Sequence, residues 1–242
     1  MLLGGTCEVY GMSEAAPSFA VVNPYTRVAA VVGTPPGDAV NAVVERLRSN
    51  DDVLAFDENL SHVTTLLSGW RVSLAVLHLL GDSKQLPRLE PVGVGAPMAR
   101  PYIGPHPLPV PSDRPDEEII MRMMTGDEVA AMEGAPPELF EELTRAALVG
   151  KQAATFVDGK AVSFCDATSE TETLWDVGIE TLEPYRGSGY AALAVSYMID
   201  QQDRRGKRPV WGAEESNPPS MRLAEKLGFT SVDRLYVLSQ RS

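Results

Sequence analysis

The first third of the chain alternates between runs of β-branched residues and stretches in which apolar residues recur with helical spacing. Two β-rich runs are separated by Asn23-Pro24-Tyr25-Thr26, a combination that is typical of a turn and predicts a hairpin. Asp38 precedes a helically spaced apolar run and is the expected cap of a helix. The elements predicted here are strands over 18–22 and 27–32, helices over 38–50 and 57–70, and a strand over 71–80.

The rest of the chain shows the same alternation with clearer boundaries. Asp158-Gly159, between two β-rich runs, is the strongest local hairpin signal. A long helix ends where Gly206 can adopt the left-handed cap conformation and Pro209 blocks continuation. Strands are predicted over 118–124, 152–157, 161–166, 174–181, 209–213 and 232–238, and helices over 126–133, 137–148, 189–205 and 219–227.

Prolines separate the two regions. Nine of the nineteen prolines lie between residues 87 and 115, a density that excludes a helix or a central strand because proline lacks an N–H donor and fixes φ. We therefore expect an extended linker over 87–115 and a second domain over 116–242. The small α/β domain expected over 1–86 contains no recognisable chemical motif and is interpreted as a packing or substrate-shaping domain. The whole pattern predicts the α/β (α+β) class.

Composition narrows the class of function. The formal net charge of −12 lies mainly in the second half of the chain and disfavours nucleic acid as a partner. No apolar run approaches the ~20 residues that span a bilayer, and no secretory signal is recognisable, so a cytoplasmic protein without membrane contact is expected. Cys7 and Cys165 are too far apart for a disulfide framework, and the three histidines show no ligand spacing, so no metal site is expected.

A glycine loop between a predicted strand and the long helix carries the candidate chemistry. Gly187 and Gly189 let the main chain approach a ligand, and the free N–H groups of the first helical turn point outward with the positive dipole end behind them. Such a loop suits a pyrophosphate. It lacks the Lys-Ser or Lys-Thr of a Walker loop, because Tyr190-Ala191 follows the second glycine, and it lacks the third glycine of a Rossmann fingerprint.

Two sequence signatures resemble those of a known family. Arg186-Gly187-Ser188-Gly189-Tyr190-Ala191 matches Gln/Arg-x-x-Gly-x-Gly/Ala, and Asn217 to Phe229 resembles an Asn-x-x-Ser/Ala motif followed by a helix that ends in Leu-Gly-Phe. Both are signatures of the GNAT family of acetyltransferases, and they occur here in the family's order. The resemblance covers residues 116–240 and implies a mixed, splayed sheet flanked by helices. Two further segments, Ile179-Glu180-Thr181 before the loop and Pro209-Val210-Trp211 before the asparagine, resemble more closely still a bacterial subgroup with an extra N-terminal region. That subgroup includes antibiotic-modifying N-acetyltransferases.

The resemblance implies acetyl-coenzyme A as co-substrate. The strand backbone around Ile179 would meet the pantetheine arm and the thioester carbonyl, and the loop would bind the pyrophosphate. Arg186 would contact the coenzyme directly or brace the loop. Asn217 and Ser220 would lie near the pantetheine, although their positions also suit a helix N-cap and a first helical turn. The implied cofactor-binding residues are Ile179, Thr181, Arg186, Gly187, Ser188, Gly189, Tyr190, Ala191, Asn217 and Ser220.

Attack of an amine on a thioester requires a base, because most amines are protonated at neutral pH. Asp176 and Glu180 are the predicted catalytic residues, and strand alternation places them on one face unless a bulge resets it. The alternative carboxylates are Glu172, Glu214 and Glu215. Many family members have a tyrosine that protonates the leaving thiolate, at the position where this chain has Ala224. Either another donor, Tyr190 or Tyr197, takes this role here, or no acid is needed.

The resemblance thus predicts an N-acetyltransferase that moves an acetyl group from acetyl-coenzyme A to a small primary amine. An amino acid derivative or an antibiotic fits this class, and the acidic surface favours a cationic acceptor. The alternatives are a transferase for a longer acyl chain and a regulatory module that binds acetyl-coenzyme A without catalysis. A homodimer is compatible with the sequence.

Overall fold

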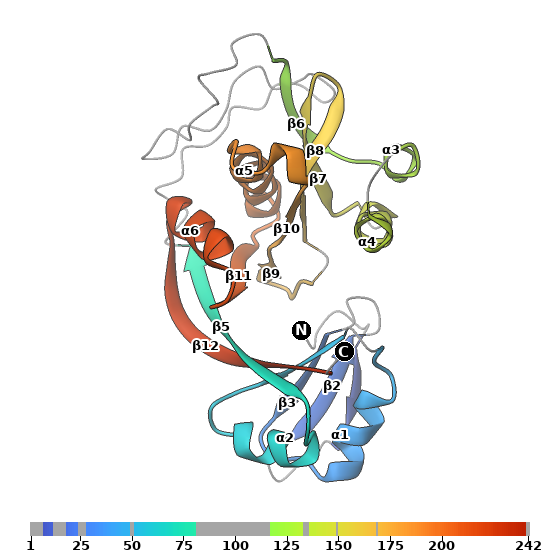
Figure 1. Cartoon of the computed structure of the whole chain (residues 1–242), viewed down its shortest axis with the longest axis vertical. Coiled ribbons are helices and arrows are strands. Elements are labelled where there is room, and N and C mark those ends of the chain that lie inside the picture. The colour runs from blue at the N-terminus through green and yellow to red at the C-terminus, as the bar shows by residue number, and fades with distance from the viewer. Residues whose placement is uncertain are drawn as a thin grey trace.

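The computed structural model describes residues 7–11, 18–23, 28–48, 51–80, 117–132, 136–148, 150–167 and 169–240, which form two sheets (Figure 1). The eight-stranded sheet has the order β1 (Glu8–Tyr10), β2 (Phe19–Asn23), β3 (Val28–Val32), β4 (Asp52–Ala55), β12 (Phe229–Ser239), β5 (Arg71–Leu80), β11 (Arg208–Glu214), β9 (Leu174–Asp176). The four-stranded sheet has the order β10 (Gly178–Thr181), β8 (Lys160–Asp166), β7 (Gln152–Val157), β6 (Ile119–Met123).

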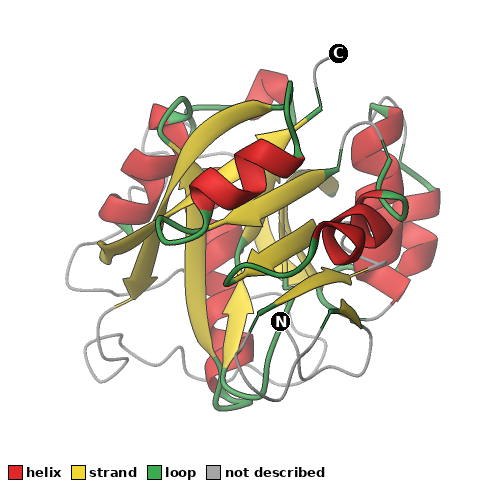
Figure 2. Ribbon diagram, turned by 90° about the horizontal axis from the view of Figure 1, so that it is seen from below, coloured by secondary structure: helices red, strands yellow, loops and turns green. Residues whose placement is uncertain are grey.

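The helices are α1 (Gly37–Val44), α2 (Leu60–Leu66), α3 (Gly126–Ala130), α4 (Pro137–Leu148), α5 (Tyr190–Asp203) and α6 (Pro218–Lys226), with a 3-10 turn η2 (Glu183–Tyr185). Figure 2 shows helices on both sides of the strands. The predicted α/β class, with a splayed mixed sheet preceded by a small α/β region, is confirmed. The predicted linker over 87–115 and the turn of the first hairpin, over 24–27, lie outside the described residues.

The N-terminal region differs from its prediction at several points. Strand β1 was not predicted, and α1 ends at Val44 rather than near residue 50. Asp38 is not the helix cap: Pro36 occupies that position, and the Asp38 carboxylate accepts the Ala39 N–H at 2.9 Å within the first turn. The second helix is shorter than predicted, because its N-cap position is Asn59, whose side chain bonds the Phe56 N–H and the Val31 carbonyl instead. Strand β4 was not predicted, because four residues give too short an alternation to detect.

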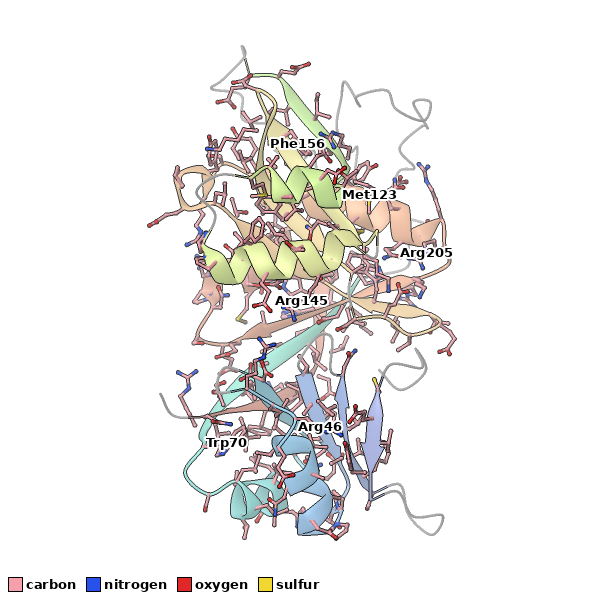
Figure 3. All side chains as sticks on the ribbon, turned by 90° about the vertical axis from the view of Figure 1, so that its right-hand side faces the viewer. Arg46, Trp70, Met123, Arg145, Phe156 and Arg205 are labelled. Carbon is pink, nitrogen blue, oxygen red and sulfur yellow. The ribbon has the colours of Figure 1, made fainter. Side chains whose placement is uncertain are left out.

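Four hydrophobic cores of the described residues stabilise these layers, of which the smallest contains Ala75, Leu235 and Val237. The other three are larger. One lies under α1 and α2 and includes Val40 and Val63, and Trp70 packs against it. The second lies between α5 and the strands of both sheets and contains Trp175. The third lies under α3 and α4, on the other face of the small sheet, and contains Phe156. Figure 3 shows Trp70 in the lower part of the molecule and Phe156 in the upper part.

Strand β5 connects the two halves of the molecule. It precedes the proline-rich segment, yet it pairs antiparallel with both β12 and β11, from Arg71 opposite Ser239 to Leu79 opposite Val210. In Figure 1 it rises from the N-terminal sheet to β11 and α6. The C-terminal strand β12 also pairs with β4. One continuous sheet therefore includes strands from both sides of the predicted linker.

The predicted strand over 174–181 is divided at Val177. Its first part, β9, pairs parallel with β11, whereas its second part, β10, pairs antiparallel with β8. The Val177 N–H still donates to the Val210 carbonyl at 3.0 Å, and the Leu182 N–H donates to Val162 on β8 at 3.0 Å. The chain thus leaves one sheet and joins the other, and β10 and β11 separate beyond Val177.

Candidate active site

The separating strands present backbone groups that neither sheet uses. Because the N–H groups of neighbouring strand residues point in opposite directions, the Leu182 bond to β8 implies that Glu180 also faces β8, while Ile179 and Thr181 face the gap between β10 and β11. On the opposite strand, Val210 faces β9, so Gly212 also directs its backbone groups into the gap. The gap is therefore bordered by two strand edges.

Both backbone groups of Thr181 form hydrogen bonds within the protein. Its N–H donates to Glu180 Oε1 at 3.0 Å, and its carbonyl accepts Arg186 Nε at 3.0 Å. Arg186 also lies 2.9 Å from Glu180 Oε1 through Nη2. Arg186 was expected either to contact the coenzyme or to brace the loop, and in the structure its side chain holds the loop against β10. The backbone groups of Ile179 that face the gap lie next to Thr181 and the Arg186 side chain that holds it.

The glycine loop follows the end of β10 and leads into α5. Gly187 and Gly189 have φ of +78° and +87°, values that side chains disfavour, and Gly189 is the N-cap residue of α5. No side chain caps this helix end. The first-turn N–H groups have no carbonyl of their own helix to bond, so the start of α5, including Ala191, is suited to an anion beside Ser188.

Two buried residues fix the start of α5. The Thr155 hydroxyl on β7 donates to the Tyr190 carbonyl at 3.0 Å, and both residues have no exposed surface. The Tyr190 hydroxyl donates to Glu117 Oε2 at 2.6 Å. Tyr190 is therefore a buried anchor of the helix, and its hydroxyl is engaged with a carboxylate.

Asn217 and Ser220 have structural partners at the start of α6. Asn217 Oδ1 accepts the Ser220 N–H at 3.3 Å, as expected for an N-cap. The Ser220 hydroxyl accepts the indole N–H of buried Trp211 at 3.0 Å. The N-cap interpretation of Asn217 is confirmed, and a contact of either residue with a coenzyme stays a prediction.

Asp176 occupies the end of β9, directly before the strands separate. Its side chain keeps exposed surface, yet desolvation by the surrounding protein and then the negative charge of Asp166 raise its pKa to about 6, against a hydrogen bond from the Val177 N–H. Asp166 is nine-tenths buried and lies on Gly178: a Cβ at Gly178 would stand 1.9 Å from Asp166 Oδ1. Glycine at 178 is thus what allows the Asp166 carboxylate to lie against β10.

Other carboxylates surround this position. Glu142 on α4 has a raised pKa because of desolvation, then Asp166 and, more weakly, Glu180, with Arg145 acting in the opposite direction. Glu180 is engaged with Arg186. Glu214 is partly buried on β11, whereas Glu172 and Glu215 are exposed. Among the candidate bases, Asp176 combines a raised pKa with a position beside the open strand edges.

Sequence reasoning missed Asp166, Gly178, Gly212 and Thr155. Each acts through a neighbour on another strand or, for Thr155, at the start of α5, and no sequence motif signals such a pairing. Ala224, where many members of the resembled family have a tyrosine, is fully buried. Cys165 is also fully buried, and burial raises the pKa of its thiol. Within the described residues, no group of histidine, cysteine, aspartate and glutamate could hold a metal ion, and no helix is long and apolar enough to cross a membrane.

Comparisons with known proteins bear on the family and the fold. Residues 144–238 match the family model described as GNAT acetyltransferase. A comparison with curated protein sequences gave no match. A GCN5-related N-acetyltransferase-like protein from Streptococcus suis has a similar structure, with a TM-score of 0.65, 16% identity, and coverage of 98% of this chain and 90% of that chain.

Two further solved structures are similar. An acetyltransferase of the GNAT family from Colwellia psychrerythraea has a TM-score of 0.53 at 13% identity and covers 96% of this chain and 84% of its own. A GCN5-related N-acetyltransferase from Kribbella flavida has a TM-score of 0.53 at 14% identity and covers 98% of this chain and 90% of its own. At these identities the likeness concerns the fold, and it extends beyond residues 144–238 into the N-terminal region.

Proposed function

We propose that this chain, whose residues 144–238 match the GNAT acetyltransferase family model, transfers an acetyl group from acetyl-coenzyme A to a primary amine. The observation that carries the proposal is the gap between β10 and β11, bordered by backbone groups and adjoining the uncapped start of α5. A pantetheine arm carries amide groups that pair with strand edges, and a pyrophosphate suits a helix N-terminus. One gap thus offers complementary groups to both parts of the same molecule.

Each part of the gap has a separate task in this proposal. The N–H groups from Gly187 to Ala191 bind the pyrophosphate, and the loop is held by Arg186. The Ile179 N–H binds the thioester carbonyl and stabilises the negative charge that develops on its oxygen, an effect of about 3–4 kcal/mol in comparable sites. Asn217 and Ser220 border the arm from α6.

Asp176 serves as the base. The amine nitrogen forms a bond to the acetyl carbon, the carbon–sulfur bond breaks, and the sulfur leaves with the electron pair. The proton lost by the amine goes to Asp176, directly or through water, and the thiolate takes a proton from solvent. A thiolate leaves readily because its conjugate acid has a pKa near 8.5, so the buried Ala224 does not prevent the reaction.

A second candidate is a module that binds acetyl-coenzyme A without turnover. The specific observation that favours it is Ala224, which is buried and carries no hydroxyl where many family members have a tyrosine. Release of free thiol in the presence of amines separates the two candidates. The same assay with longer acyl-coenzyme A esters tests the preference for acetyl.

The binding proposal is tested by thermal unfolding with and without millimolar acetyl-coenzyme A, which should raise the melting temperature. Gly189→Val should abolish this rise, because a β-branched residue disfavours φ of +87° and the loop must change shape. Gly206→Val is the matched control: it places the same residue at φ of +73° beyond the other end of α5. Both variants should lose about 1–3 kcal/mol of stability, but the control should keep the rise. A rise retained in Gly189→Val contradicts the assigned loop.

A further inference from the structure

One face of the eight-stranded sheet connects Asp176 with strand β5 of the N-terminal region. Asp176 is the register partner of Val210 on β11, and Val210 is the partner of Leu79 on β5. Two residues along, Gly212 is the partner of Leu77. Register partners direct their side chains to the same face, and so do residues two apart on one strand. Asp176, Val210, Leu79, Leu77 and the Gly212 position therefore share one face.

This face is apolar and accessible beside Asp176. Val210, Leu79 and Leu77 are each partly exposed, and Gly212 is exposed with no side chain to cover the sheet. A Cβ added at Gly212 would meet only Leu77, at an ordinary contact distance of 3.6 Å. The opposite face is filled by the buried side chains of Trp175, Trp211 and His78. Helices α5 and α6 contact β11, and the core that α5 shares with Trp175 and Trp211 lies on that filled face.

Carboxylates flank the apolar surface. Asp176 stands at one side, and Glu214 is two residues beyond Gly212 on the same face. Farther along this face, the pKa of Asp52 is raised by desolvation and then by Glu214, while Arg71 lowers it. A molecule that lies over Gly212 therefore meets aliphatic side chains beneath it and negative charge at its ends. The complementary chemistry is an ammonium group joined to an apolar chain.

We propose that this face binds the acceptor, and that the acceptor is a primary amine with an alkyl or aryl chain. The chain lies over Gly212 against Leu77, Leu79 and Val210, which places the amino group beside Asp176 and the strand gap. Strand β5, and with it the N-terminal region, thereby determines acceptor specificity. The inference rests on the proposed acetyl transfer and adds the substrate class.

A series of n-alkylamines tests the substrate class, because its members differ in length but not in charge. Thiol release from acetyl-coenzyme A is followed with ethylamine, butylamine and hexylamine. The specificity constant kcat/KM should rise about three- to fourfold for each added methylene that leaves water. Equal constants along the series, or turnover confined to polar amines such as ethanolamine, would overturn the inference but leave acetyl transfer intact.

Two variants test where the acceptor chain binds. Gly212→Val should lower kcat/KM for hexylamine about tenfold or more, because the isopropyl group occupies the open position, and Leu77→Thr should flatten the dependence on chain length. Val72→Thr is the control, since Val72 is exposed on the same strand but on the opposite face. Leu77→Thr and Val72→Thr should keep the melting-temperature rise with acetyl-coenzyme A. Unchanged length dependence in both variants would overturn the assignment.

The experiment also separates this inference from the proposed function. If acetyl-coenzyme A does not stabilise the protein, acetyl transfer itself fails. If it does stabilise the protein but no amine reacts, binding of hexylamine and ethylamine to the complex is compared by saturation-transfer NMR. Preferential, Gly212-dependent binding of hexylamine supports the acceptor surface, and its absence refutes it.

Discussion

At the scale of a single residue, Asp176 links function to stability. Its pKa in the folded protein is about 6, against an ordinary value of 3.8, so the folded state binds the proton more tightly than the unfolded chain. The stabilisation from this group is complete below about pH 4 and is lost as the pH rises through about 6. At neutral pH the ionised carboxylate therefore disfavours the fold, as expected of a group retained for chemistry.

Asp176→Asn should reverse this cost and remove the base. Its melting temperature should exceed that of the wild type above pH 6 by about 2–4 °C, a small effect because the carboxyl keeps contact with water, and should equal it near pH 4. Wild-type kcat/KM for an amine should fall about tenfold per unit below pH 6, whereas the residual activity of the variant should lack this limb. Equal thermal stability at both pH values, together with an unchanged rate profile, would assign the base elsewhere.

The sequence predicted the types of the site residues better than their partners. Gly187 and Gly189 were predictable because their spacing before a helix is a local property. The bond between Ser220 and Trp211 and the contact of Asp166 with Gly178 were not, because each depends on which strands and helices become neighbours. A sequence pattern gives the alternation along one strand but not the identity of the next strand.

At the scale of an element, the division at Val177 creates the gap, although a single strand was predicted over 174–181. Strand-forming residues such as Trp175, Val177 and Ile179 recur at every second position, so one strand was the natural prediction, although Gly178 is a residue that strands disfavour. The exchange of partner from β11 to β8 depends on Gly178, where the Asp166 carboxylate takes the place of a side chain.

Gly178→Ala should therefore destabilise the protein by about 1–3 kcal/mol, because the new Cβ and the Asp166 carboxylate cannot occupy the same space. Adding Asp166→Ala should recover part of the loss, which a double-mutant cycle from denaturant unfolding measures. Gly212→Ala is the matched control, a strand glycine with room for a Cβ, and it should be close to neutral. Additive effects of the Gly178 and Asp166 substitutions would show that the contact does not govern the strand exchange.

At the scale of the whole molecule, the order of elements was predictable and their pairing was not. Most predicted helices and strands correspond to observed ones, and those over 71–80, 137–148 and 152–157 agree to the residue. The insertion of β5 between β12 and β11 joins residues as distant as Arg71 and Ser239, and only the burial of a shared sheet selects such a pairing. The eight-stranded sheet thus crosses the predicted domain limits.

This topology predicts that residues 117–242 do not fold alone. Without β5, strands β11 and β12 would each expose a row of unpaired backbone groups, and the buried side chains of Ala75 and Val76 would be missing from the sheet. The isolated fragment should aggregate or show no cooperative unfolding by circular dichroism, and co-expression with residues 1–86 should restore a soluble complex that binds acetyl-coenzyme A. The control is the full chain with a protease site inserted between 87 and 115, which should stay associated and active after cleavage. A fragment that folds cooperatively and binds the coenzyme alone would show that β5 adds acceptor specificity to a domain complete without it.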